Sequence, residues 1–347
     1  MPRVDHRVLG WLVPCLLAAW LFHHLHFEWS INEQYNYGWA VPFLAAFLFY
    51  TRWPARPSPA PSRSRLLNAT SWAILALLLP VRLVEEANPD WRLLSWIFAL
   101  AVVAYGLLAL ARTGGGAWVR HFAFPLCFVL VSVPWLVQVE NVIVQGLTRA
   151  VAYVAVEIAG WIGIGAYQLG NVIQLHNGFV GVDEACSGVK TLQAAIMVAL
   201  FLGELLRLSA GRRVVLVLLG CGWVFACNVG RATTLVVLAA TRGLDALKQW
   251  HDGIGTAVLV LGMLGLMAIA WLLSSREEAA SSVASSSGMR AADRGAKGPA
   301  TLEALAAVAW LAAIFAGTEL WYRWHEQRLI ARPEWHARWP SEQTAVQ

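Results

Sequence analysis

Three side chains that lie far apart in the chain are of the types that perform nucleophilic catalysis together. Cys186 lies in VDEACSGVKTL, Arg231 in NVGRATTL and His251 in HDGIG. A cysteine attacks as its thiolate, and a nearby guanidinium, a histidine or a helix N-terminus favours that form. Histidine side chains ordinarily titrate near neutrality, so they are suited to protonating a leaving amine and then activating an acceptor. These types predict acyl transfer through Cys186 if the fold brings them together.

The neighbours of Cys186 and Arg231 suit the same chemistry. Ser187 and Gly188 follow the cysteine and leave its thiol uncrowded. An apolar run begins directly afterwards, and the free backbone amides at the start of such a helix could bind the oxyanion of a tetrahedral intermediate. Arg231 could stabilise that oxyanion by its charge, and Asn228 precedes it by three residues.

The composition indicates which elements must position these groups. Of the 347 residues, 58% are hydrophobic, only 14% are charged and 19 are tryptophan, which excludes an ordinary soluble surface. The predicted fold class is all-α, a polytopic transmembrane helical bundle. Apolar runs near the roughly 20 residues that cross a bilayer lie at 8–27, 38–50, 66–81, 93–111, 122–137, 189–206, 214–240, 253–273 and 302–320. The first run is too long, and too poor in a cleavage site, for a removed signal peptide, so we predict a retained anchor.

These runs divide the chain into three predicted parts. Residues 1–273 form a transmembrane core of about eight helices. Residues 274–300 are rich in Ser, Ala and Gly, which is typical of a flexible linker, here on the cytoplasmic side. Residues 301–347 hold one further transmembrane helix and a short outer tail.

The placement of Lys and Arg predicts the orientation. If the N-terminus is cytoplasmic, the short inside loops hold 15 of the 26 Lys and Arg residues, whereas the outside loops hold acids such as Glu28, Glu85 and Glu140. The positive-inside rule therefore favours a cytoplasmic N-terminus. The net charge of +5 reflects this orientation, and no nucleic-acid partner is expected. The basic tail after Trp321 is the exception, because it lies on the outside.

This orientation brings the three candidate groups to the outer face at similar depth. Residues 138–187 are outside, so Cys186 lies at the outer mouth of the next helix. Arg231 lies in the outer half of its apolar run, and an arginine near the centre of such a run costs about 2.5–3.5 kcal/mol, which marks it as a candidate functional residue. His251 lies at the outer entrance of the following helix. Singly, each residue fits packing, a snorkelling helix end or an interfacial polar belt, but their agreement favours a shared site.

Neither a metal nor an organic cofactor is predicted. The cysteines at 15, 127, 186, 221 and 227 form no CxxC pair and have no metal-ligand spacing. His23, His24 and His26 lie near the outer end of the first helix, but adjacent histidines point to different sides, which favours an interfacial belt over a metal site. Glycines 114–116 lack the surroundings of a phosphate site and predict a turn.

The three motifs resemble those of the exosortase and archaeosortase family of multi-pass membrane cysteine transpeptidases. VDEACSGVKTL, NVGRATTL and HDGIG match the ACSG, NxxR and HxxxG motifs of that family in order and spacing. FEWSINEQYNYGWAVPFLAAFLFYTRW is similar to its first outer loop and second helix, and FAFPLCFVLVSVPW to its Phe-Pro-Leu helix. The resemblance runs from about Phe27 to Leu273. One departure is that Tyr35 and Tyr37 frame an Asn where the family commonly has a Ser-His pair.

The resemblance implies a substrate class and a location. Family members recognise membrane-anchored proteins with a C-terminal sorting signal of the PEP-CTERM type, which is a short motif followed by one transmembrane helix and a basic end. They cleave near the motif through a Cys thioester and pass the chain to a membrane or surface acceptor, often in bacteria that make exopolysaccharide. We therefore expect a protein of the bacterial inner membrane with its active site on the periplasmic face.

The resemblance also implies roles for individual residues. Cys186 is the expected nucleophile, Arg231 the stabiliser of the oxyanion or thiolate, and His251 the acid and base. Supporting positions of the motifs are Asn228, Ser187 and Gly188.

Two alternatives share these sequence features. One is simple proteolysis, in which water takes the acyl group in place of an amine acceptor. The other is a non-enzymatic membrane component of polysaccharide synthesis or export, in which the same side chains line a passage or bind a partner. A transporter is less favoured, because the chain shows neither an internal repeat nor a pair of broken helices.

Overall fold

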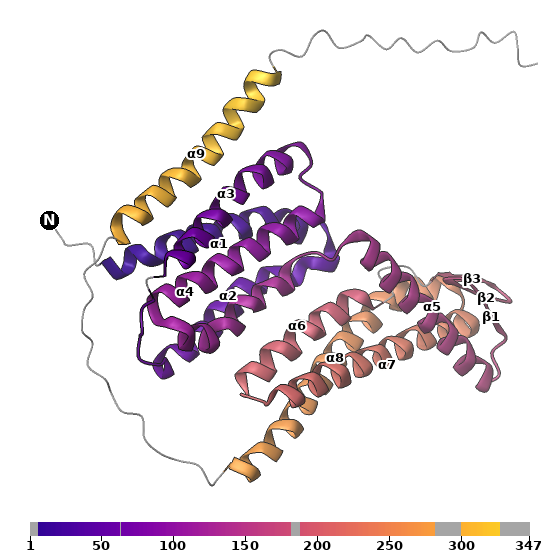
Figure 1. The fold of residues 1–347 in the computed structure, drawn as a ribbon. Helices are drawn as coiled ribbons and strands as arrows, with labels where there is room; N and C mark the ends of the chain where they lie inside the picture. Colours follow the sequence, from indigo (N-terminus) through magenta and orange to yellow (C-terminus); the bar gives the residue numbers. More distant parts are fainter. Residues whose placement is uncertain (1–5, 63, 182–187, 282–299, 327–347) are drawn as a thin grey trace, which may run out of the picture.

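The computed structural model describes residues 6–62, 64–181, 188–281 and 300–326, and within them the chain is an all-α bundle with one small sheet (Figure 1). The predicted fold class is confirmed. Six of the described helices are long and apolar enough to cross a membrane, as expected of a multi-pass membrane protein. The elements are α1 (His6–Ile31), η1 (Glu33–Ala40), α2 (Val41–Arg52), η2 (Trp53–Ala55), α3 (Arg65–Ala87), α4 (Arg92–Phe128), η3 (Val129–Ser132), α5 (Val137–Trp161), β1 (Ala166–Leu169), β2 (Val172–Leu175), β3 (Gly178–Gly181), α6 (Val189–Leu205), α7 (Ala210–Arg242), α8 (Leu244–Ser281) and α9 (Ala300–Glu326).

The helices gather in two groups (Figure 1). One group holds α1 to α4 and α9, and the other holds α5 to α8 with the sheet. The second group is centred on α7, which packs against α5, α6 and α8. Helix α6 begins and α7 ends at the same end of this group, which we call the site end. The other end of the group is the opposite end. The described parts of the three candidate motifs, Gly188 onward in the first and the whole of the other two, are in the second group.

Helix α4 is two arms joined at a break. Gly115 has a φ of +73°, a left-handed conformation that glycine adopts without strain. A side chain there would meet the carbonyl of Ala60 at 2.6 Å. The two arms fold back on each other. This is seen from Trp96 in the first arm, which donates to the carbonyl of Pro134, just beyond the second arm, at 2.8 Å. The predicted turn at glycines 114–116 therefore closes a helical hairpin.

Residues 137–181, which the sequence analysis left as an outside region without elements, form α5 and an antiparallel sheet of order β1-β2-β3. One face of α5 and the inward residues of the sheet cover α7 from Val229 to Ala239. Asn177 in the turn between β2 and β3 donates to the Ala239 carbonyl at 2.7 Å. The region is thus a folded cover over the part of α7 that carries Arg231.

Helix α7 is longer than a bilayer core. Its 33 residues rise about 50 Å, against about 30 Å for the hydrocarbon. Arg231 lies 21 residues beyond Ala210, a rise of about 32 Å. If α7 enters the hydrocarbon near Ala210, Arg231 therefore lies close to the other boundary, where a charge costs less than at the centre.

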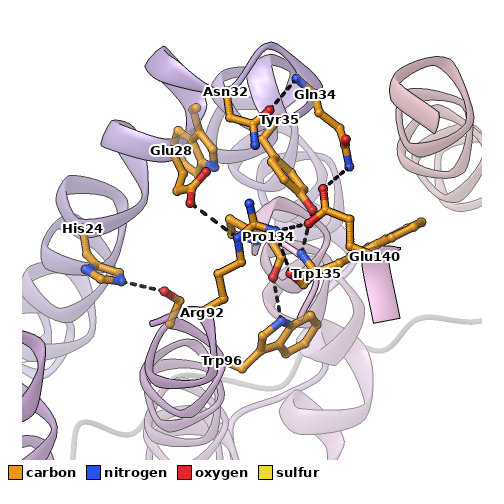
Figure 2. Close-up of polar contacts among 12 residues, drawn as sticks. His24, Glu28, Asn32, Gln34, Tyr35, Arg92, Trp96, Pro134, Trp135 and Glu140 are labelled. Carbon is orange, nitrogen blue, oxygen red and sulfur yellow. Dashed lines mark hydrogen bonds and ion pairs between the residues drawn. The ribbon is translucent and has the colours of Figure 1, made fainter. Parts of the chain in front are cut away.

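A polar network at the site end ties α1, η1, α4 and α5 together (Figure 2). Arg92 forms ion pairs with Glu28 and with Glu140 at the start of α5. Gln34 donates to the other Glu140 oxygen at 2.7 Å. The Tyr35 hydroxyl accepts from the Trp135 backbone amide at 2.9 Å, and burial raises the pKa of this hydroxyl. The network fixes the first turn of α5, the helix that then covers α7.

A second buried network lies at the opposite end and joins the two groups. Glu204 at the end of α6 is 4% exposed and forms ion pairs with Arg52 of α2 and with Arg213 of α7, the latter at 2.5 Å. His121 of α4 contacts the Arg52 carbonyl through Nε2 at 2.9 Å. One carboxylate therefore neutralises two guanidinium groups from different helices.

Removing that carboxylate should destabilise the bundle. We expect Glu204→Ala to lower the free energy of unfolding by about 3 kcal/mol, because two partly buried cations lose their partner. The measurement is the apparent melting temperature in detergent, which should fall by several degrees. Glu319→Ala is the matched control, since Glu319 forms an exposed pair with Arg323 and such pairs contribute little. Equal melting temperatures for the two variants would contradict the assigned role.

Helix α9 packs on the first group, away from α7 and α8. Trp310 donates to the Leu75 carbonyl at 3.0 Å, and Tyr322 donates to the Leu83 carbonyl at 2.7 Å, so its aromatic residues bind it to α3. Helix α8 continues to Ser281, past the core boundary predicted at residue 273.

Candidate active site

The predicted nucleophile lies outside the described residues, as does Ser187. The structure describes the chain on both sides of this segment, at Gly181 and at Gly188. Gly181 ends β3 and, together with Arg231, lines a small hollow of about 10 Å³ between the sheet and α7. Gly188 caps α6. Both flanking residues are therefore held near α7.

Gly188 fits closely against Asn228. It has a φ of +77°, and a side chain there would meet the amide nitrogen of Asn228 at 2.7 Å. Glycine is the residue that combines this left-handed backbone with so close an approach. The predicted supporting pair thus lies together, and it joins the start of α6 to the middle of α7.

Arg231 and His251 are brought into direct contact. Nη2 of Arg231 lies 3.2 Å from Nε2 of His251, and Nδ1 of His251 lies 3.0 Å from a carboxylate oxygen of Asp252. A guanidinium can only donate, so Nε2 of His251 is the acceptor in this contact. The other ring nitrogen, Nδ1, is then the donor to Asp252. The histidine is therefore held with Nε2 as its basic atom.

The next turn of α8 leaves room for the guanidinium. A side chain at Gly255 would meet Nη2 of Arg231 at 3.1 Å, whereas one at Gly253 would meet nothing within 4 Å. The glycine three residues after Asp252 thus leaves space for the Arg231 guanidinium beside α8.

Arg231 is partly buried, and its Nε has no hydrogen-bond partner among the described residues. Within the described part of the chain, this N–H of the guanidinium has no acceptor. His251 is more open, with its side chain 37% exposed. A guanidinium beside a solvent-accessible imidazole is suited to stabilising an oxyanion and moving a proton.

The packing of α7 on α8 sets this geometry. Leu266 of α8 fits over Gly220 of α7, where an added Cβ would lie 2.6 Å from the leucine side chain. Trp223 of α7 fits over Gly265 of α8, where an added Cβ would lie 2.0 Å from the indole ring. Such contacts through glycine fix how far one helix slides along the other. They place His251 level with Arg231.

Sequence reasoning predicted Asn228, Gly188, Arg231 and His251 as site residues, and the structure places them in two neighbouring contacts along α7, Gly188 with Asn228 and Arg231 with His251. It missed Asp252, whose signal was its position directly after the candidate base. It also missed the cover formed by α5 and the sheet, because no candidate residue pointed to it.

The three histidines near the end of α1, which were weighed as a metal site, contact other side chains or each other. His24 contacts Ser95 at 2.8 Å and Glu85 at 2.5 Å, and the His23 and His26 rings stack with centroids 5.0 Å apart. Among the described residues no group of three or more His, Cys, Asp and Glu side chains is placed to hold a metal ion. The described cysteines, at 15, 127, 221 and 227, are free thiols.

Comparison with known proteins adds the family. The family model for the transmembrane exosortase (EpsH) matches residues 29–285, which include all three motifs and end just after α8. Neither the curated proteins nor the solved structures contain a match. Helix α9 lies outside the matched region. Because the match covers well over half of the chain and contains the Arg231–His251 pair, the chain belongs to the transmembrane exosortase family.

Proposed function

We propose that this exosortase-family protein is a membrane cysteine transpeptidase. It cleaves proteins that carry a C-terminal sorting signal of the PEP-CTERM type and passes the released acyl group to an acceptor amine. Cys186 is the nucleophile, Arg231 stabilises negative charge, and His251 is the acid and base.

The contact between Arg231 and His251 carries the proposal. It joins two of the three motifs, and the chain that leads to the third is held beside it. Gly188 lies against Asn228, one helical turn from Arg231, and only two peptide units, about 7 Å at full extension, separate Gly188 from Cys186. This short tether supports a site shared by all three motifs.

The first half of the reaction forms a thioester. Nε2 of His251 takes the proton of Cys186, and the sulfur attacks the carbonyl carbon of the scissile peptide bond. Arg231, whose Nε–H has no acceptor among the described residues, stabilises the resulting oxyanion. As the intermediate collapses, the C–N bond breaks and His251 gives its proton to the leaving amine.

The second half releases the acyl group. The acceptor amine attacks the thioester carbonyl while His251 accepts its proton. The C–S bond breaks, and the proton returns to the sulfur. Asp252 holds the imidazole by accepting from Nδ1, which leaves Nε2 to carry the proton in both halves.

The proposed location is the bacterial inner membrane, with the site end on the periplasmic face. The basic residues at the opposite end support this orientation. Arg212 and Arg213 begin α7 at the opposite end, where Arg52 also lies, and cytoplasmic loops are enriched in such residues. A periplasmic site would meet sorting signals after their export, in cells that make exopolysaccharide.

Co-expression with a reporter tests the proposal. The reporter ends in a candidate motif, one transmembrane helix and basic residues from the same genome, and its size and mass are followed. We expect a shortened reporter whose new end carries an acceptor. A new end that is a free carboxylate would show hydrolysis, and an unchanged reporter would contradict both enzymatic proposals and favour the non-enzymatic membrane component.

The close fit at Gly188 gives a second test. We expect Gly188→Ala to lower processing by about tenfold or more, because the alanine must adopt a strained left-handed conformation and push Asn228 away. The amount of processed reporter, normalised to the amount of folded enzyme, measures the effect.

Gly170 provides the matched control. It has a φ of +65° in the turn between β1 and β2, but a side chain there would meet nothing within 4 Å. Gly170→Ala therefore carries similar backbone strain without the displacement of Asn228. Equal losses in both variants would show that the Gly188 contact has no special part in the reaction.

A further inference from the structure

A groove runs along the outside of the bundle between α7 and α8. Its volume is about 360 Å³, and its lining residues come from both helices: Trp223, Ala226, Cys227, Gly230, Arg231, Thr234, Ile254, Val258 and Leu261. Most are apolar, and the part of the groove nearest the site end includes Arg231. It is therefore continuous with the candidate active site while opening toward the surroundings of the bundle.

Small residues form one wall of the groove. Every fourth position of α7 along the groove is small, at Ala226, Gly230 and Thr234. Gly222 continues this row by one turn toward the opposite end. All four are exposed. From Gly222 to Thr234 the row covers 13 residues, a rise of about 18 Å. Small residues separated by three other residues are the pattern that lets one membrane helix approach another closely, and this row has that pattern.

Two glycines of this row are not explained by contacts inside the chain. Gly220, on another face of α7, makes room for Leu266. A side chain at Gly222 or Gly230 would meet nothing within 4 Å. Glycine within a helix is less stable than alanine, so glycine at exposed positions with no internal neighbour indicates that something outside the chain comes close there.

We propose that this groove binds the transmembrane helix of the substrate, an inference that rests on the proposed function. The helix would lie against the small-residue row, with Leu261 and Val258 packing on its other side. Its sorting motif would then leave the groove at Arg231, beside His251. Because the motif precedes the helix, the substrate helix would run opposite to α7 and bring its basic end to the opposite end of the bundle.

The groove fits a helix better than a lipid chain or a second copy of the protein. Lipid acyl chains are flexible and pack on an apolar surface whatever the size of its side chains, so lipid binding does not explain a row of small residues. A second copy docked here would cover the access to Arg231, whereas a substrate helix uses that access. Helix α9 of the chain itself packs on the other helical group.

Disulfide cross-linking tests docking without chemistry. Ala226→Cys is introduced into a chain whose five cysteines, at 15, 127, 186, 221 and 227, are replaced by alanine, and it is co-expressed with reporters carrying single cysteines along their transmembrane helix. Val260→Cys is the matched control, because Val260 is 53% exposed on α8 and does not line the groove. We expect adducts with the reporter from position 226, recurring every three or four reporter residues, and about tenfold fewer from position 260. Equal yields from both positions, or adducts only between two copies of the chain, would overturn the proposal.

Filling the groove tests its role in turnover. We expect Ala226→Leu to lower reporter processing by about tenfold or more, since overpacking prevents close helix approach, while Val260→Leu processes normally. Normal processing by Ala226→Leu would overturn the docking proposal alone. If the unmodified chain leaves the reporter intact but position 226 still forms adducts, docking stands and the proposed chemistry fails.

Discussion

Cys186→Ala will abolish reporter processing, with a loss of about a million-fold that lies below detection. The reaction proposed here forms a bond between the sulfur and the scissile carbonyl carbon, and alanine offers no atom that can attack. The Arg231–His251 pair would remain, but a site without its nucleophile loses nearly all of its rate because such residues act as a unit. The measurement is reporter size over time, with enzyme amounts matched by quantitative blotting.

Cys127→Ala is the control for the loss of a thiol. Cys127 is an exposed free cysteine in the second arm of α4, in the other helical group. Its replacement should leave processing unchanged. Processing that persists in Cys186→Ala and disappears in Cys127→Ala would move the nucleophile to another part of the chain.

His251→Ala should slow processing by about 10²- to 10⁴-fold, the usual contribution of a positioned acid and base. Nε2 of His251 is the atom that faces the Arg231 guanidinium, at 3.2 Å from Nη2. The remaining rate should respond to added imidazole, which is small enough to occupy the space left by the ring. Rescue by imidazole separates loss of proton transfer from loss of structure.

His176→Ala is the matched control for His251. His176 is exposed in the turn between β2 and β3, at the same end of the molecule. It should retain full activity. Removing Arg231 from the His251→Ala variant should add little further loss, because the two residues work together. Full additivity of the two losses, or no response to imidazole, would contradict a shared role.

Much of the fold could be predicted, because hydrophobic runs of membrane length leave few alternatives. The break at Gly115 and the long helices around it follow from three successive glycines between apolar runs. Helix α5 was missed because its polar residues, among them Glu140 and Arg149, interrupt the run; they are spaced to leave one apolar face for α7. The strands were missed because four residues are too few for a clear alternating pattern.

The site could be predicted only in part. The predicted membrane orientation put Arg231 and His251 on the same side of the membrane and at a similar depth. Their contact could not be predicted, because it depends on how Leu266 and Trp223 lock α7 against α8, and those are ordinary apolar residues in a sequence full of them. The groove was missed for the same reason, since exposed small residues stand out only once their faces are known.

The most direct test of the central claim is to find the acyl group on the sulfur. Purified protein in vesicles is mixed with the reporter, quenched in acid, digested and examined by mass spectrometry. The mechanism predicts a peptide containing Cys186 joined through a thioester to the reporter residue at the cleavage point, and its release by hydroxylamine. A cleaved reporter with no such adduct, or with the acyl group on another residue, would contradict it.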